Sequence, residues 1–265
     1  MVPLPAGGPP VPQRPSPDLR LRHTSLRPAR LWHARLGAPA EVALHFPVIF
    51  ELGPLRLPAH AVCESLAYAL GYALRHPWRL PRLLLMLPAL LAYACRLLDR
   101  GGLKSLLVRA TFGGLPRQAV EAWTARWLPG VLARGLYAEA LQAIAAARAR
   151  GATLVLLSAS PDLYVPALAA HLGFTRTLCT QLRWRADGRL DGRLATPNRR
   201  GEEKVRCVAA LLAELQPTRS SAYGNSRADL PHLRLVSAGV YVNGHHLPDR
   251  GGSLRVERWS TAGGI

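Results

Sequence analysis

The stretch TLVLLSASP, residues 153–161, runs from apolar side chains into two serines and a proline. A short apolar run that ends in turn residues predicts a buried strand over 153–157, followed by a helix over 162–171. Helices are also expected over 202–215 and 228–235, strands over 220–223 and 240–243, and a hairpin over 182–194 that turns at the dipeptide Asp187-Gly188. Strands that alternate with helices predict a parallel, doubly wound sheet of the α/β class.

Ligands of doubly wound sheets bind beyond the carboxyl ends of the strands, so the loops at those ends are the places to look for a site. After the strand at 153–157, the sequence Ser158-Ala159-Ser160-Pro161 offers a hydroxyl and free backbone N–H groups. That combination favours an anion site, and a serine before a helix is also an ordinary N-cap.

Two further loops carry polar residues in informative places. The segment NRRGEEK, residues 198–204, puts Lys204 in the first turn of a predicted helix, where the helix dipole disfavours a cation. Only Lys104 and Lys204 are lysines among 34 basic residues, so a lysine there suggests a need for a compact point charge. The segment GNSRADLP, residues 224–231, contains Asn225 and Asp229, whose oxygens suit Mg²⁺, although Asp229 also suits a helix N-terminus.

Taken together, these three segments resemble the motifs of the haloacid dehalogenase (HAD) superfamily, specifically its phosphoserine-phosphatase-like subfamily IB. The hairpin DGRLDGRL, residues 187–194, is similar to the subfamily's segment between its second and third motifs. The resemblance covers residues 140–245 and, with fewer matching features, 42–139. It implies a HAD-like (Rossmann-like) core over 37–55 and 136–250. A helical cap, residues 56–135, would be inserted after the first strand, and 251–265 would form a tail.

The resemblance also implies an activity and a set of site residues. The family uses an aspartate nucleophile in a D-x-D-G-T motif after its first strand, forms an aspartyl-phosphate and requires Mg²⁺. By this resemblance Ser158, Ala159 and Lys204 bind the phosphate of a small phosphorylated substrate, and Ser158 and Lys204 take part in catalysis. Asn225 and Asp229 would hold the metal.

Motif one is where the sequence departs from the family. Residues 42–44 and 48–50 are both short apolar runs of strand type, and the candidate stretch for motif one is VIFELGPL, residues 48–55. Glu51 stands at the nucleophile position as catalytic residue and metal ligand. The second acid is absent, because Gly53 stands there or a residue is deleted, and Asn225 replaces an aspartate of the last motif. A displacement on the scale of 1 Å can cost about a hundredfold in rate, and loss of a general acid or base a further ~10²–10⁴-fold. Two functions therefore stay open: a Mg²⁺-dependent phosphomonoesterase, and a pseudo-phosphatase that binds a phosphorylated ligand or partner.

The net charge of +18 raises a third possibility, an arginine-rich binder of nucleic acid or of a membrane surface. Because the basic residues are almost all arginines, coding bias explains the charge better, and we expect no specific nucleic-acid partner. Residues 1–36 hold eight prolines, six arginines and one acid, which predicts a disordered arm.

Residues 83–95 are almost wholly apolar, lie between Arg82 and Arg96, and are too few to span a bilayer. A buried helical hairpin is the favoured interpretation, and weak contact of the apolar cap with a membrane surface is the alternative. The four cysteines are far apart, and residues 1–17 lack the apolar segment of a signal peptide, so a reducing, cytoplasmic location is expected.

Overall fold

The computed structural model describes residues 41–45, 51–52, 55–56, 61–244 and 254–260. The predicted arm over 1–36 and the predicted strand over 48–50 lie outside these ranges. Within them, the chain forms a mixed α/β fold around one main sheet.

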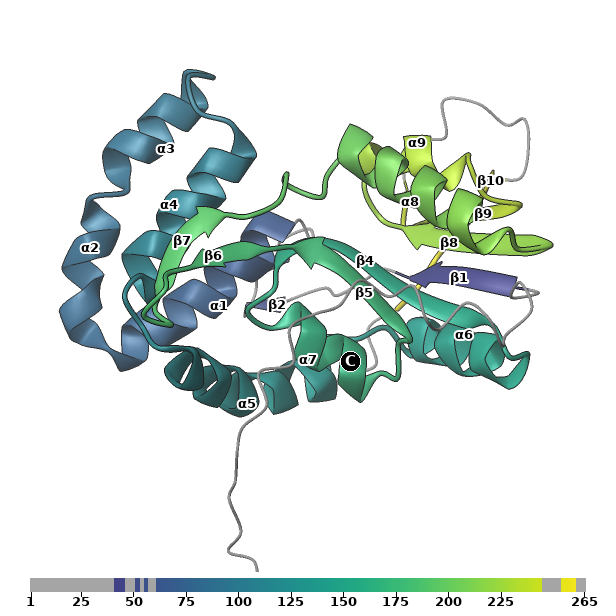
Figure 1. Ribbon diagram of the computed structural model, residues 1–265, viewed down its shortest axis with the longest axis horizontal. Coiled ribbons are helices and arrows are strands. Elements are labelled where there is room, and N and C mark those ends of the chain that lie inside the picture. The colour runs from purple at the N-terminus through teal and green to yellow at the C-terminus, as the bar shows by residue number, and fades with distance from the viewer. Residues whose placement is uncertain (1–40, 46–50, 53–54, 57–60, 245–253, 261–265) are drawn as a thin grey trace, which may run out of the picture. The chain divides into compact units, whose positions relative to one another are not determined.

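The main sheet has six described strands in the order β10-β9-β8-β1-β4-β5 (Figure 1). Their bounds are β1 (Glu41–His45), β4 (Thr153–Pro161), β5 (Arg176–Thr180), β8 (Arg219–Gly224), β9 (Ala238–Val242) and β10 (Leu254–Glu257). Each neighbouring pair is parallel, and Leu44 of β1 lies opposite both Val155 of β4 and Ala222 of β8. The predicted parallel α/β sheet is therefore confirmed.

Helices cover both faces of this sheet. One face carries α6 (Ala138–Ala149) and α7 (Val165–His171), and the other carries α8 (Glu202–Leu215), η2 (Arg227–Asp229) and α9 (Leu230–Leu233) (Figure 1). Successive side chains of a strand point to opposite faces, so β4 serves both layers. Val155 and Leu157 pack in one cluster with α8 and α9, whereas Leu154 packs with α6.

The C-terminal segment belongs to this sheet. Residues 254–257, which the sequence placed in a tail, form the edge strand β10 and pair with β9. Trp259, just beyond it, is buried with its ring centroid 5.9 Å from that of Tyr137 and 5.4 Å from that of Tyr223. Burial of this large aromatic ring holds the segment against the core.

Most of the remaining helices lie between β1 and β4 in the chain. They are α1 (Ala61–Arg75), η1 (Pro77–Arg79), α2 (Leu80–Leu84), α3 (Leu87–Ala94), α4 (Arg100–Phe112) and α5 (Arg117–Arg134), preceded by the short antiparallel pair β2 (Glu51–Leu52) and β3 (Leu55–Arg56).

The predicted hairpin also forms, from β6 (Leu182–Trp184) and β7 (Leu190–Leu194), and it packs on α4. Gly192 permits this approach, because a Cβ there would lie 2.8 Å from the Cα of Arg109.

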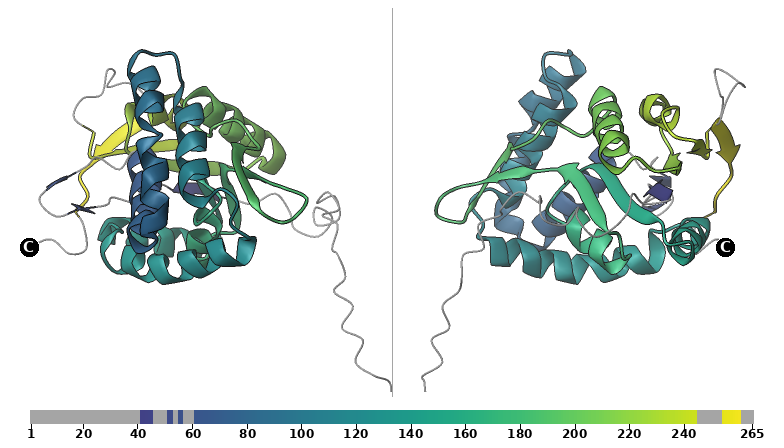
Figure 2. Two further views of the ribbon diagram at one scale, coloured as in Figure 1. Left: turned by 90° about the vertical axis from the view of Figure 1, so that its left-hand side faces the viewer. Right: turned by 45° about the vertical axis from the view of Figure 1, so that its right-hand side comes forward.

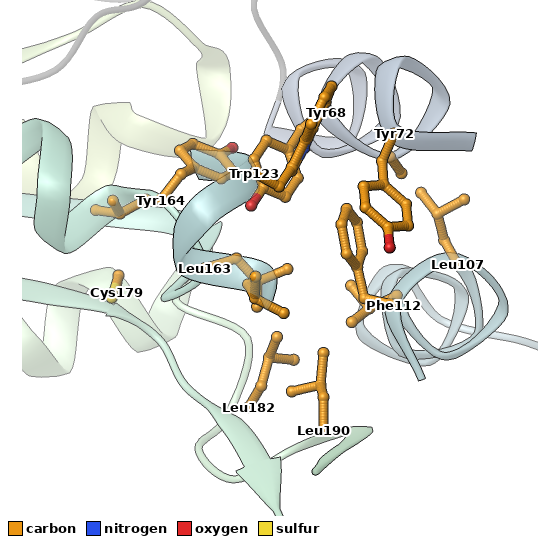
Figure 3. Close-up of a cluster of buried hydrophobic side chains, with 14 of the residues drawn as sticks. Tyr68, Tyr72, Leu107, Phe112, Trp123, Leu163, Tyr164, Cys179, Leu182 and Leu190 are labelled. Carbon is orange, nitrogen blue, oxygen red and sulfur yellow. The ribbon is translucent and has the colours of Figure 1, made fainter. Parts of the chain in front are cut away.

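A cluster of buried aromatic and aliphatic side chains joins these helices to α7 and the hairpin (Figure 3). The Tyr68 ring of α1 stacks on Phe112 of α4, with centroids 5.1 Å apart. Its hydroxyl lies 2.7 Å from Oγ1 of Thr124 on α5. The phenol therefore has a polar partner inside an otherwise apolar cluster, and α1, α4 and α5 are fixed to one another.

The favoured interpretation of residues 83–95 as a buried hairpin is wrong. Met86 is buried, but Leu84, Leu85, Leu87, Leu90 and Leu91 are exposed. An apolar run predicts burial only where another element covers it, and α2 and α3 pack on α4 from one side. Across the described residues, no helix is both long and apolar enough to span a membrane.

Candidate functional site

The carboxyl end of β4 carries the first predicted site residues. The hydroxyl oxygen of Ser158 accepts the backbone N–H of Ser160 at 3.0 Å, where the pairing of β4 with β5 is irregular. The carbonyl of Ala159 accepts a hydrogen bond from Oγ1 of Thr180 at 2.9 Å. Ala159 and Ser160 are buried and Ser158 is half-buried. These hydrogen bonds therefore hold the Ser158 hydroxyl in a fixed position near the carboxyl end of β4.

Lys204 occupies the first turn of α8, as predicted. Its Nζ donates to Oδ1 of Asp229 at 2.6 Å, and the two side chains are only 7% and 5% exposed. Burial removes water from both charges, so each depends on the other for its stability. The structure thus brings together two of the residues that the sequence singled out separately.

Asp229 is held on its other side by the turn that follows β8. Its Oδ2 accepts the Ser226 N–H at 3.0 Å and the Ser226 hydroxyl at 2.7 Å, which is a capping box at the start of η2. A Cβ at Gly224 would lie 2.6 Å from the Cβ of Asp229, so only glycine lets the end of β8 approach this carboxylate. Asn225, half-buried, lies in the same turn.

The charges around Asp229 set the protonation of two groups. Burial raises the pKa of Asp229, but the Lys204 ammonium, His232 and the hydrogen bonds outweigh it and lower the pKa to about 2. Burial, together with the Lys204 charge, lowers the pKa of His232 to about 4. At neutral pH the pair is therefore Asp229 carboxylate and neutral His232. Neither ring nitrogen of His232 has a hydrogen-bond partner among the described residues.

Sequence reasoning missed a second buried lysine. Lys104 of α4 is 4% exposed, and its Nζ donates to the carbonyl of Ala159 and, at 2.8 Å, to Oδ1 of Asn198. Thr180 ties the same loops together, because its Oγ1 lies 3.4 Å from Oδ1 of Asn198 and accepts the N–H of Arg199 at 3.1 Å. Lys104 thus connects α4 to the end of β4 and to the loop before α8. The scarcity of lysine marked it, but nothing in the sequence placed it beside residues 159 and 198.

Two arginines add positive charge at the same place. Burial and the nearby Arg100 charge lower the pKa of Arg200, while Asp229 and Tyr93 oppose that shift. Arg100, at the start of α4, donates from Nε to the hydroxyl of Tyr93 at 3.0 Å. Arg200, from the loop before α8, thus lies within electrostatic range of both Asp229 and the Arg100 charge of α4, an arrangement that favours an anionic ligand.

Glu51 is not brought to this site by the described structure. It lies in β2, which pairs with β3, and the strand between β4 and β8 in the main sheet is β1, which ends at His45. The intervening sequence, FPVIF over 46–50, lies outside the described residues and contains no acid. Among the described residues, β1 is the strand that lies between β4 and β8, and the predicted strand over 48–50 lies outside them.

The described residues do not fit a Mg²⁺ site. They contain no group of three or more His, Cys, Asp or Glu side chains that could hold a metal. Both oxygens of Asp229 are bonded to Lys204 or Ser226, and Asn225 supplies an amide in place of a carboxylate. Mg²⁺ needs six oxygen ligands, normally with one or two carboxylates available to it.

Comparisons with known proteins agree with this fold. Protein CicA of Caulobacter vibrioides (strain NA1000 / CB15N) is 32% identical over 155 residues, which are 58% of this chain and 68% of CicA. A protein of unknown function from Bordetella pertussis Tohama I has a TM-score of 0.57 at 20% identity, with 77% of this chain and 91% of that chain covered. A probable phosphoserine phosphatase from Vibrio cholerae has a TM-score of 0.53 at 16% identity, with 79% and 57% covered. At these identities the two solved structures show a shared fold.

A family comparison covers most of the described chain. Residues 61–234 match the sequence profile of the haloacid dehalogenase-like hydrolases. The matched range contains Ser158, Lys204, Asn225 and Asp229, and it begins after β1 and Glu51. This chain belongs to the haloacid dehalogenase-like hydrolase family.

Proposed function

We propose that this chain is a phosphatase-like hydrolase of subfamily IB that binds a phosphomonoester at the carboxyl ends of β4 and β8. The observation that carries the proposal is the buried Lys204–Asp229 pair, 2.6 Å apart, at the start of α8. A buried cation whose position is fixed by a carboxylate is suited to bind a phosphate oxygen as a point charge.

The carboxyl end of β4 supplies the complementary donor. The Ser158 hydroxyl accepts the Ser160 N–H, so its own hydrogen is available to a phosphate oxygen. Lys104 holds the Ala159 carbonyl, which fixes the orientation of the adjoining peptide group. In this proposal the phosphate is bound by Ser158, Ala159 and Lys204, and Lys104 positions the carboxyl end of β4.

We assign α1 to α5 the role of a cap. Lys104 and Arg100 both come from α4, so this segment contributes positive charge as well as apolar packing to the site. A cap that contacts the phosphate-binding end of β4 would couple substrate binding to the packing of α4 on the core. The ligand would be a small phosphorylated molecule.

Hydrolysis needs a carboxylate to attack phosphorus and expel the alcohol, giving an acyl phosphate that water then cleaves. Glu51 is the first acid after β1, so it is the residue that we assign to this role. In this family Mg²⁺ would neutralise phosphate charge, but the described residues do not make up its site.

Binding without turnover is the second candidate, and specific observations favour it. The stretch 46–50 has no acid, Gly53 replaces the second acid of motif one, and Asn225 replaces a carboxylate. The phosphate-binding groups are retained, whereas the groups that would break the bond are altered. A pseudo-phosphatase would therefore keep affinity for a phosphorylated ligand or partner.

One set of assays separates these outcomes. We would measure p-nitrophenyl phosphate hydrolysis with and without Mg²⁺ for the full chain, Lys204→Ala and Glu51→Ala. Arg206→Gln, on an exposed position of α8, is the matched control. If turnover requires Mg²⁺, is lost in Lys204→Ala and in Glu51→Ala, and is kept in Arg206→Gln, the chain is a hydrolase with Glu51 as its nucleophile.

Thermal unfolding with inorganic phosphate and orthovanadate tests binding separately. Protection of the wild type and Arg206→Gln, but not of Lys204→Ala, without turnover supports the pseudo-phosphatase. Because Lys204→Ala leaves a buried carboxylate, the charge-neutral double variant Lys204→Met/Asp229→Asn is measured beside it. The proposal would be refuted if the wild type showed no turnover and no protection by either anion.

A further inference from the structure

The segment that runs from η1 through α2 and α3 to the residues just after α3 exposes six large apolar side chains. The set, called here the α2–α3 face, comprises Trp78, Leu84, Leu85, Leu87, Leu91 and Leu97, each 62 to 83% exposed. Single exposed leucines are ordinary in a soluble protein, but a group of them on adjacent elements marks an interaction surface. Figure 2, left, looks onto α2 and α3 from outside, and no described helix or strand covers them there.

This face is held in place from behind. Arg79 of η1 donates from Nη1 to the Thr111 carbonyl at 2.7 Å and to the Gly113 carbonyl at 3.3 Å, at the C-terminus of α4. Met86 is buried in the apolar cluster, and Leu83 and Tyr93 pack partly against it. The exposed leucines therefore project from an anchored surface, and their exposure does not result from a lack of contacts behind them.

The charge of the region is of one sign. Residues 65–98 contain four arginines, at 75, 79, 82 and 96, and no acid. Arg82 of α2 and Arg96 just after α3 are exposed, and so is Arg75 at the end of α1, whose guanidinium lies over the Trp123 ring. The partner should therefore combine apolar and anionic character.

A second copy of the chain fits this surface poorly. A two-fold contact brings the same patch of both copies together, so arginine would meet arginine without an acid from 65–98 to pair with it. The acyl chains and anionic headgroups of a bilayer complement both the leucines and the arginines. Trp78 suits the boundary between headgroups and acyl chains.

We propose that the α2–α3 face docks on the surface of an anionic lipid bilayer. The helices lie in the plane of the interface, with Leu85 and Leu91 among the side chains that enter the acyl region and Arg82 and Arg96 at the headgroups. At five and eight residues, α2 and α3 are far too short to cross the membrane. This inference goes beyond the proposed function and requires no turnover.

Vesicle flotation of the full chain tests the proposal. We expect binding to vesicles of phosphatidylcholine mixed with phosphatidylglycerol, and little binding to phosphatidylcholine alone. Leu85→Ser/Leu91→Ser should lower the partition coefficient roughly a hundredfold, because two buried apolar side chains are lost. Arg82→Gln/Arg96→Gln should lower it roughly thirtyfold. Far-UV circular dichroism and thermal unfolding establish that both variants remain folded.

Matched controls separate this face from the rest of the chain. Leu141→Ser/Leu235→Ser and Arg185→Gln/Arg219→Gln change exposed residues elsewhere, and both should float as the wild type does. Equal flotation of the Leu85/Leu91 variant and the wild type would assign binding to other residues, such as the arginines of 1–36, and overturn the proposal. Absence of wild-type flotation would overturn it too. So would a wild-type dimer, seen by light scattering, that the Leu85/Leu91 variant converts to a monomer without any lipid binding.

Hydrolysis and phosphate protection are measured on the same samples. The Leu85/Leu91 variant should match the wild type in both assays, because neither residue belongs to the proposed site. Loss of flotation with unchanged phosphate protection therefore reports on docking alone. A failure of phosphate binding in the wild type would refute the proposed function and leave the flotation result to decide this inference.

Discussion

The two buried lysines of this chain meet the core in different ways. Lys204, on α8, faces a carboxylate 2.6 Å away, whereas Lys104, on α4, donates to a backbone carbonyl and to the amide of Asn198. The first arrangement fixes a charge by an opposite charge. Through the two described hydrogen bonds, the second joins β4 to the loop before α8 by neutral oxygens. A buried lysine can therefore have two uses in one fold: Lys204 balances the charge of a buried carboxylate, and Lys104 connects separate segments of the chain.

The largest expected effect comes from breaking the charge balance at α8. Asp229→Asn removes the carboxylate that faces Lys204 and should lower the free energy of unfolding by about 3–5 kcal/mol, because a buried cation loses its counter-charge. Urea unfolding measures the loss, and Lys204→Met/Asp229→Asn should recover most of it. A single-variant cost below about 1 kcal/mol would contradict this account of the pair.

The next largest effect is a dependence of stability on pH, and it arises at His232, beside the Lys204–Asp229 pair. The pKa of His232 is lowered from 6.5 to about 4 in the folded chain, so the unfolded chain binds the proton more tightly between these values. Stability should therefore fall as the pH drops from 6.5 towards 4, by about 2–3 kcal/mol. Below pH 4, protonation of Asp229, whose folded pKa is about 2, adds a further loss.

The His232 contribution is measured by urea unfolding at a series of pH values. His232→Leu should abolish the loss between pH 6.5 and 4, because no group at 232 can then titrate. His171→Leu changes an exposed histidine on α7 and should leave the loss in place. An unchanged pH profile in His232→Leu would assign the dependence to another group.

A smaller effect on stability is expected at α4. Lys104→Met keeps the buried apolar stem, and the Ala159 carbonyl retains its hydrogen bond from Thr180, so unfolding should become easier by only about 1–2 kcal/mol. Phosphate protection in thermal unfolding should nevertheless fall, because residues 158–160 of β4 lose their link to α4. Undiminished protection would show that Lys104 has no part in positioning these residues.

The smallest effect sets the baseline for the comparison. Arg206 pairs with Glu203 at 3.2 Å on the surface of α8, with its side chain 69% exposed. Arg206→Gln should change the free energy of unfolding by less than about 0.5 kcal/mol, because solvent screens an exposed pair. A cost comparable to that of Asp229→Asn would mean that burial does not explain the strength of the Lys204 pair.

Local chemistry explains which parts of the fold and site could be predicted. The strand that begins at Thr153, the helix beginning at Glu202 and the turn at Asp229 each carry their signal within a few residues of sequence. Their meeting at one edge follows from the rule that carboxyl ends of parallel strands lie together. The Lys204–Asp229 pair was predictable to that extent, though its contact distance and burial were not.

The remaining features depend on contacts between distant segments. Lys104 and Ala159 are far apart in the sequence, and a helical pattern does not tell which loop a side chain reaches. Residues 83–95 have the composition of a buried segment, but burial requires a neighbour that no sequence pattern specifies. Residues 254–257 form a strand only because β9 offers them an edge. Glu51 was matched to motif one by its spacing from a short apolar run, whereas β1 holds the strand position.

The central position of β1 also determines when the sheet can be completed during synthesis. β1 pairs with β4, which begins at Thr153, and with β8, which begins at Arg219. The ribosome therefore makes the whole α1–α5 segment before β1 gains its first partner, and most of the chain before it gains its second. Pairings so distant in sequence close large loops and form slowly. The nascent chain must carry an unpaired central strand through most of its translation, which makes β1 the element most dependent on protection from aggregation.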